Sequence, residues 1–250
     1  MKLNADEVEA SGQTAGGLEA ARNRQATYRL FAALFLYPSQ DRMRELRQLA
    51  REFTEGRESS LDFSFPPELW QLLEGLPLQN SPKIEEEYTA LFSVKPKAPP
   101  YESYYVDPEG FSRGWIGVNL DGVYTASGVS VSSTNKEPSD HVAVELEFMA
   151  YLCSLEAQAI EDRDESARAH SVRHQAGFLD QHLGLWFSTF ARKVREASPN
   201  SLYDMVARAA DSFIAQQLEM LRSTIIPSNS RIPENGRAKL QTGEPSRFSG

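Results

Sequence analysis

The apolar residues of this 250-residue chain recur at intervals of three and four positions over most of its length. Between residues 139 and 161, for example, Val142, Leu146, Met149 and Cys153 would lie on one face of a single helix. A helix with one apolar face is stable when that face is buried against other helices. The spacing therefore predicts an all-α fold, organised as a single globular helical bundle.

The same spacing predicts the other helices, and some of their ends carry recognisable start or stop residues. Ser81 and Pro82 suit the N-cap and the first position of a helix, whereas Tyr37-Pro38 should end the first helix. The stripes expected to face the core are Tyr28, Phe31, Leu34 and Phe35; Met43, Leu46, Ala50 and Phe53; Leu69, Trp70 and Leu73; Ile84, Tyr88, Leu91 and Phe92; Phe178, Leu179, Leu183, Trp186, Phe190 and Val194; and Tyr203, Val206, Ala210, Phe213 and Leu221.

Composition divides the chain into one domain and two tails. Residues 1–22 are rich in Gly, Ala, Glu and Ser, and residues 226–250 contain Pro, Ser, Asn and Gly with almost no apolar residue. Such segments bury too little apolar surface to fold, so both are expected to be disordered. The roughly 200 residues between them are enough for one buried core. We therefore expect an all-helical domain over residues 23–225.

Residues 93–137 interrupt the helical pattern with four prolines and several glycines. This composition predicts a long ordered loop before the central helix. Loops of this length are uncommon inside a compact domain and are often functional. The alternation at Val123, Thr125, Val129 and Val131 leaves a short hairpin as the alternative.

Charge and cysteine content exclude several classes of protein. The formal net charge of −9 disfavours nucleic acid as a partner, but it is compatible with a basic peptide. The single cysteine, Cys153, allows no intramolecular disulfide and no cysteine-based metal cluster. Residues 1–17 do not form a secretory signal, and the longest apolar run, Phe31–Tyr37, is too short to span a bilayer. We expect a soluble, cytoplasmic protein.

Residues 137–141, Glu-Pro-Ser-Asp-His, place acids and a histidine just before the central helix. Asp140 in the first turn would be stabilised by the helix dipole and by free backbone N–H groups. The same field favours a neutral His141. The pair therefore either caps the helix and pins the preceding segment, or forms a polar recognition site in which a carboxylate pairs with an arginine.

This segment, followed by Glu145-Leu146-x-Phe148-Met149, resembles the hallmark of the TorD/DmsD/NarJ family of chaperones for molybdenum enzymes, and we call residues 137–141 the hallmark segment. Three further landmarks occur in the family's order. They are the opening helix Tyr28–Tyr37, the segment Pro99–Tyr104, and a later helix with His182-Leu183-x-x-Trp186. The resemblance covers roughly residues 25–222.

The resemblance implies an all-helical protein that has no catalytic role, metal or cofactor. Such proteins bind the twin-arginine signal peptide, or the core, of a molybdopterin enzyme's catalytic subunit, hold it until its cofactor is inserted, and then allow export. Carried over by motif, the peptide-binding residues are Asp140 and His141, then Glu137 and Pro138, with Tyr101, Glu102, Ser103 and Glu145 as neighbours. Trp70, Tyr88 and Phe92 could line an apolar groove, although aromatic residues at helical spacing are more often core.

Two other functions stay open from the residues alone. A NarJ-like assembly chaperone for an enzyme that is not exported would keep the same binding chemistry with a different client. A metal-dependent helical enzyme would use His141 with Glu145 and His170 with His174, since each pair is four residues apart. Against this enzyme, the two Glu-x-x-His motifs of di-iron bundles are missing.

The sequence leaves the oligomeric state and nucleotide binding open. A monomer and a domain-swapped dimer are both compatible with it, and the segment from Ser93 to Glu137 is the natural hinge for exchange. The chain has no Gly-x-x-x-x-Gly-Lys-Ser/Thr loop, so a guanine nucleotide would need a different kind of site.

Overall fold

The computed structural model describes residues 5–55, 67–75, 81–111, 113–131 and 137–225. In these ranges the regular structure is helical, apart from one isolated β-bridge, which confirms the all-α prediction. In chain order the elements are α1 (Ala5–Leu34), α2 (Gln40–Glu55), α3 (Pro67–Gly75), α4 (Ser81–Tyr88), the π-helical turn η3 (Thr89–Ser93), α5 (Glu102–Val106), α6 (Arg113–Ala126), α7 (Val142–Glu161), α8 (Glu165–Gln181), α9 (Leu183–Ala197) and α10 (Leu202–Ile225).

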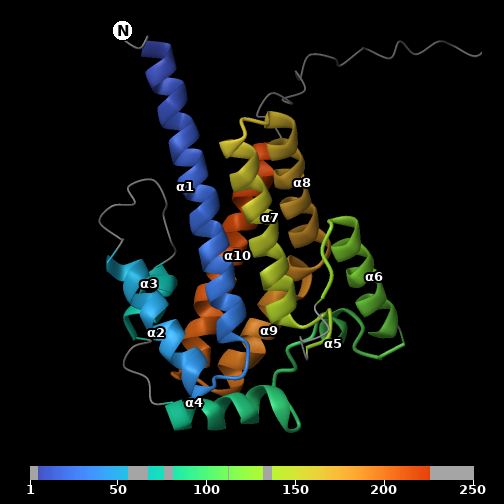
Figure 1. The fold of residues 1–250 in the computed structure, drawn as a ribbon. Helices are drawn as coiled ribbons and strands as arrows, with labels where there is room; N and C mark the ends of the chain where they lie inside the picture. Colours follow the sequence, from blue (N-terminus) through green and yellow to red (C-terminus); the bar gives the residue numbers. More distant parts are fainter. Residues whose placement is uncertain (1–4, 56–66, 76–80, 112, 132–136, 226–250) are drawn as a thin grey trace, which may run out of the picture.

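The bundle is built around α7, which packs along α1 on one side and α8 on the other, with α9 and α10 beside them (Figure 1). Because α7 has neighbours on several sides, its sequence is apolar nearly all round rather than along one stripe. The helix begins three residues after the expected Ser139 and ends at Glu161, as predicted. Arg163 follows with a φ of 56°, a left-handed residue of the kind that often ends a helix.

Most of the predicted stripes meet in one core rich in aromatic side chains. Tyr88, Phe92, Trp186 and Phe190 are all buried, as is Cys153. Trp70 is half-buried and packs against this core. The side chains of Ala50, Phe53, Leu69 and Leu73 lie outside the described part of the structure. The bundle is therefore held together by large apolar side chains brought from both halves of the chain.

The N-terminal boundary of the domain differs from the prediction. Residues 5–22, expected as part of a disordered tail, belong to α1. Ala21 is buried against Ala157 and Ile160 of α7, and Arg22 Nη2 lies 2.6 Å from Glu161 Oε1. Small side chains let this part of α1 pack closely on α7. The sequence pattern missed it because it depends on large apolar side chains. The ordered domain therefore starts before residue 23, while the expected tail at 226–250 lies outside the described residues.

The segment expected as one long loop contains two helices, α5 and α6. Val123 and Thr125, which suggested a hairpin, lie within α6. The inner side of α6 carries Leu120 and Tyr124, which are buried in the core. Burial of these side chains outweighs the low helix propensity of the glycines in this helix.

None of the described helices is both long enough and apolar enough to cross a membrane.

Candidate functional site

Two segments that are far apart in the chain meet at the start of α7. Tyr101 and His141 form the isolated β-bridge. The main-chain N–H of Glu102 donates to the carbonyl oxygen of Asp140 over 2.9 Å. These contacts hold the beginning of α5 against the beginning of α7, at the lower end of α7 in Figure 1. The predicted site residues of both segments therefore lie in one place.

Asp140 binds within this junction and is almost completely buried. Its Oδ2 accepts a hydrogen bond from the main-chain N–H of Ser103 over 3.3 Å, at the first turn of α5. Helix α6 is joined to the same point. The hydroxyl of Tyr124 donates to the carbonyl of Ser139 over 2.9 Å, and the Ser139 hydroxyl donates to Asp121. The hallmark segment thus connects α5, α6 and α7.

His141, rather than Asp140, caps α7. Its Nδ1 accepts a hydrogen bond from the main-chain N–H of Ala143 over 3.1 Å, which leaves the ring proton on Nε2, 3.7 Å from Glu137 Oε2. Burial lowers the pKa of His141 from 6.5 to about 4. The neutral ring agrees with the prediction, but its cause is burial rather than the helix dipole. Asp140 lies before the helix and not in its first turn as predicted, and its carboxylate accepts a hydrogen bond from α5 instead.

The neutral His141 predicts a pH dependence of stability. A histidine whose folded pKa is lowered stabilises the fold above pH 6.5, and this contribution is lost as the pH falls through the folded pKa of about 4. Between pH 7 and pH 4 the wild type should lose about 3 kcal/mol more unfolding free energy than His141→Asn. Asparagine keeps the cap but does not titrate. Urea unfolding at both pH values measures this difference, and equal losses in the two proteins would contradict the assignment.

Two more buried carboxyl groups, those of Glu102 and Glu145, lie close to Asp140 and His141, and we call these four residues with their contacts the cluster. Each of the two carboxyl groups contacts a residue near the start of α9. Glu145 Oε2 accepts a hydrogen bond from Trp186 Nε1 over 3.2 Å, and its Oε1 has no hydrogen-bond partner. Glu102 lies 3.2 Å from Nδ1 of His182 through both carboxylate oxygens. Burial, and then repulsion from the Glu102 carboxylate, raise the pKa of Glu145 well above its usual value. The cluster therefore holds more acidic groups than positive charge to balance them.

The eight predicted site residues divide into a buried group and an accessible group. The buried residues are Glu102, Ser103, Asp140, His141 and Glu145. The residues that reach the surface are Pro138, which is exposed, and Glu137 and Tyr101, which are half-buried. The Tyr101 ring packs edge-to-face on the His141 ring, with centroids 5.4 Å apart. The buried group can position the accessible residues, which are the ones able to contact a ligand in this conformation.

His182 and Trp186 complete the cluster, although the sequence placed neither of them among the predicted site residues. Both side chains are buried, at 5% and 1% exposed, and the burial of Trp186 agrees with its place on a predicted core stripe. Their hydrogen bonds to Glu102 and Glu145 depend on how α9 packs, which helical spacing does not reveal. Tyr88 and Phe92 are core residues as well, so they do not line an exposed groove.

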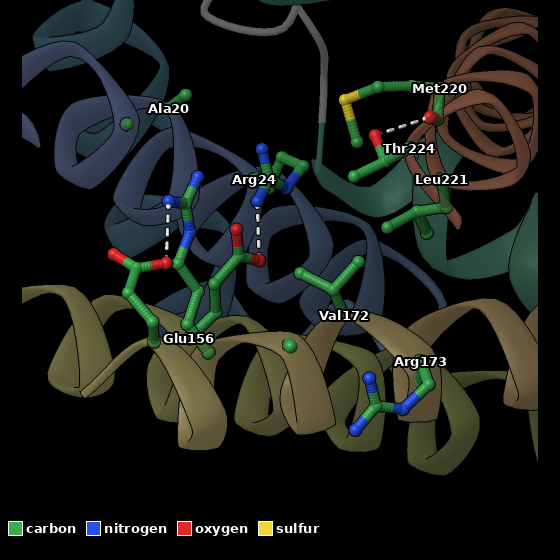
Figure 2. Close-up of a pocket in the computed structure, with 12 residues that line it drawn as sticks. Ala20, Arg24, Glu156, Val172, Arg173, Met220, Leu221 and Thr224 are labelled. Atoms are coloured by element: carbon green, nitrogen blue, oxygen red, sulfur yellow. Dashed lines mark hydrogen bonds and ion pairs between the residues drawn. The ribbon is translucent and has the colours of Figure 1, made fainter. Parts of the chain in front are cut away.

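A separate pocket of about 560 Å³ lies between α1, α8 and α10 (Figure 2). Arg24 and Glu156 form a buried ion pair at this pocket, with Nη2 and Oε2 2.6 Å apart. Arg168, Arg173 and the apolar Val172 also line it. Glu156 lies near the end of α7 and the hallmark segment lies before its start. The pocket is therefore distinct from the cluster and contains none of the predicted site residues.

The four residues of the metal-enzyme alternative do not meet. His141 and Glu145 lie at the start of α7. His170 and His174 lie on α8, with ring centroids 4.1 Å apart, and the following turn of α8 contacts the later part of α7, where Gln175 bonds Glu156. In the part of the chain that the structure describes, no group of three or more His, Cys, Asp or Glu side chains is arranged to hold a metal ion.

Comparison with known proteins defines the class. The model of the nitrate reductase delta subunit family matches residues 64–192, which is more than half of the chain and includes every residue of the cluster at the start of α7. A TorD chaperone of Vibrio cholerae is 33% identical over 161 residues, covering 62% of this chain and 71% of that protein. The chain therefore belongs to the TorD/NarJ-like family of maturation chaperones, as its hallmark segment indicated.

Other relatives point in the same direction. A selenate reductase assembly chaperone of Thauera selenatis is 30% identical over 159 residues, covering 60% of this chain and 71% of that protein. A crystal structure of a redox enzyme maturation protein from Archaeoglobus fulgidus superimposes with a TM-score of 0.50 at 25% identity, covering 76% of this chain and 93% of the other. The chain spans only 64% of the length of two further Vibrio cholerae TorD proteins.

Proposed function

We propose that this protein is a cytoplasmic, non-catalytic chaperone for the catalytic subunit of a molybdopterin oxidoreductase. It binds the twin-arginine signal peptide or the core of the apo subunit, and assists cofactor insertion before export. The printed names of its relatives, a TorD chaperone and a selenate reductase assembly chaperone, support this class of client. A monomer and a domain-swapped dimer both remain compatible with the proposal.

The observation that carries the proposal is the acidic junction at the start of α7. Main-chain hydrogen bonds and the Asp140–Ser103 contact hold the backbone of this junction in place. Glu137 lies at its surface with a side chain that is 29% exposed. A carboxylate on a fixed frame suits a guanidinium, which forms paired, charge-assisted hydrogen bonds. We choose Glu137 for the first contact because Asp140 is only 7% exposed.

A calorimetric titration with a signal peptide tests this function. The peptide should come from a molybdoenzyme encoded beside the chaperone, and a version with both arginines replaced by lysine is the control. We expect micromolar or tighter binding of the arginine peptide and roughly tenfold weaker binding of the lysine peptide, because lysine cannot form the paired bonds. Glu137→Gln should weaken binding of the arginine peptide by up to about fivefold, as for a partly exposed ion pair.

Two variants sharpen the test. Glu165→Gln is the matched control, because this exposed carboxylate lies on α8 beside the separate pocket and should bind the peptide like the wild type. Asp140→Asn keeps an acceptor for the Ser103 N–H and should bind nearly as well. A larger loss with Asp140→Asn than with Glu137→Gln, at unchanged stability, would make Asp140 the direct contact. Failure of the wild type to bind either peptide would refute signal-peptide recognition.

A second candidate is a NarJ-like assembly chaperone whose client stays on the cytoplasmic side. The family model that matches half of the chain carries the description of a nitrate reductase delta subunit, which favours this alternative. The protein would then bind the body of its client rather than an export signal. A pull-down with the mature catalytic subunit, lacking any signal peptide, distinguishes the two clients.

A further inference from the structure

The outward face of α6 carries large apolar side chains that nothing in the described structure covers. Phe111 is 83% exposed, Trp115 is 74% exposed and Val118 is 60% exposed. Trp115 and Val118 are three residues apart and share one face of α6, and Phe111 lies just before the helix. The opposite face, with Leu120 and Tyr124, is buried in the core.

This exposed face is held in place and is not a loosely attached helix. Tyr124 anchors α6 through its hydrogen bond to the Ser139 carbonyl, and the Ser139 hydroxyl bonds Asp121. Figure 1 shows α6 at the edge of the molecule, outside the helices that surround α7. Apart from the adjoining residues of the helix, no described atom lies within 4 Å of the place where a Cβ would be at Gly114 or Gly122, so these positions beside the apolar residues are open to a ligand. A fixed, open apolar face of this kind marks a binding surface.

The area of this face fits a peptide better than a second copy of the chain. Phe111, Trp115 and Val118 together expose roughly 400 Å², which is within the range of functional patches on monomers. A stable dimer buries about 800 Å² on each partner, roughly twice this area. An apolar stretch of a bound peptide would need only this smaller surface.

The charges around α6 favour a partner with basic residues. Asp107, Glu109, Asp121 and Glu137 lie in the segments that border the face, and the basic residues between positions 101 and 137 are Arg113 and Lys136, so acidic residues outnumber basic ones. The Ser139–Asp121 contact joins α6 directly to the hallmark segment. From Trp115 to Asp121 the helix rises only about 9 Å. Three extended peptide residues span that distance.

We propose that the outward face of α6, formed by Trp115 and Val118 together with the preceding Phe111, binds the apolar stretch of the client's signal peptide while the arginine pair lies at Glu137. This inference rests on the proposed function and extends it by assigning the apolar part of the ligand to a surface outside the hallmark segment. The bound peptide therefore lies across the junction of α6 and α7, with its basic end at the junction and its apolar stretch along α6.

The test compares two peptides and two double variants of the full chain. One peptide is the complete signal peptide, and the other keeps the arginine pair but replaces the apolar stretch with serine and glycine. The test variant is Trp115→Ser with Val118→Asn. The control is Leu185→Ser with Val94→Asn, because these residues are apolar and exposed at 61% and 68% but lie on other elements. All four positions are solvent-exposed, so both variants should fold, which circular dichroism verifies.

We expect the α6 variant to bind the complete peptide about tenfold more weakly than the wild type does. The α6 variant and the wild type should bind the serine-glycine peptide with the same affinity. The control variant should match the wild type with both peptides. Wild-type affinity of the α6 variant for the complete peptide would overturn the inference while leaving the proposed function intact. Light scattering that shows a wild-type dimer dissociated by the α6 variant would also overturn it, because a second copy would then cover the face. A wild type that binds neither peptide would refute signal-peptide recognition, the part of the proposed function on which this inference rests.

Discussion

Replacing Glu156 with alanine is expected to lower the free energy of unfolding by about 3–5 kcal/mol, because it leaves the buried Arg24 guanidinium without its counter-charge. Both side chains of the pair are almost fully buried, at 5% and 6% exposed. Glu156 Oε2 also accepts a hydrogen bond from Gln175 Nε2 over 2.7 Å, so the substitution leaves a second buried donor unpaired. Urea unfolding monitored by circular dichroism measures the loss.

Two controls separate the buried charge from other effects of the substitution. The double variant Arg24→Met with Glu156→Met removes both charges and should recover most of the stability, since apolar residues can replace a buried ion pair. Arg22→Ala breaks the nearby pair with Glu161, whose side chains are 57% and 40% exposed, and should change stability by less than about 1 kcal/mol. A double variant as unstable as Glu156→Ala would show that packing, not charge, stabilises this end of the bundle.

Replacing Phe190 with alanine is expected to destabilise the fold by about 3–5 kcal/mol, the usual result of removing a buried aromatic ring. Phe190 is fully buried. Its ring centroid lies 5.4 Å from that of Phe35, 5.5 Å from that of Trp186 and 5.6 Å from that of Phe187. Phe35 lies directly after α1, whereas Trp186 and Phe187 lie on α9, so the cavity would weaken the contact between the two halves of the chain.

The matched control for Phe190 is on the same helix. Leu185→Ala truncates a side chain that is 61% exposed and should change the free energy of unfolding by no more than about 0.5 kcal/mol. Chemical denaturation of both variants gives the comparison. If Phe190→Ala lost no more stability than Leu185→Ala, the aromatic cluster would not be the centre of the core.

The sequence was most informative where large apolar residues repeat on one face. The central helix α7 and the buried Tyr88, Phe92, Trp186 and Phe190 were predicted for this reason. Helix α6 was missed because it has apolar residues on both sides, so no single stripe stands out, and its glycines resemble a loop. The early part of α1 was missed because it packs through small side chains.

The candidate site was predicted at the level of segments and not of atoms. The hallmark segment and the segment around Tyr101 were both identified, and the structure brings them together. Burial of Asp140 and the capping role of His141 depend on which main-chain groups approach these side chains after folding. The contact of His182 with Glu102 likewise needs α9 to pack beside α5, which no local pattern specifies.

The bridge between Tyr101 and His141 has an evolutionary consequence. It is made of main-chain atoms, as is the bond from Val142 N–H to the Pro100 carbonyl over 2.9 Å. Main-chain hydrogen bonds form with almost any side chain. They therefore hold the two ends of the intervening segment together whatever its sequence is. Outside the few side chains that anchor α6, that segment is free to diverge without loosening the bundle. On the proposal that the outward face of α6 binds the apolar stretch of the client's signal peptide, exchanging residues 104–136 between two relatives should change which client peptide each one prefers.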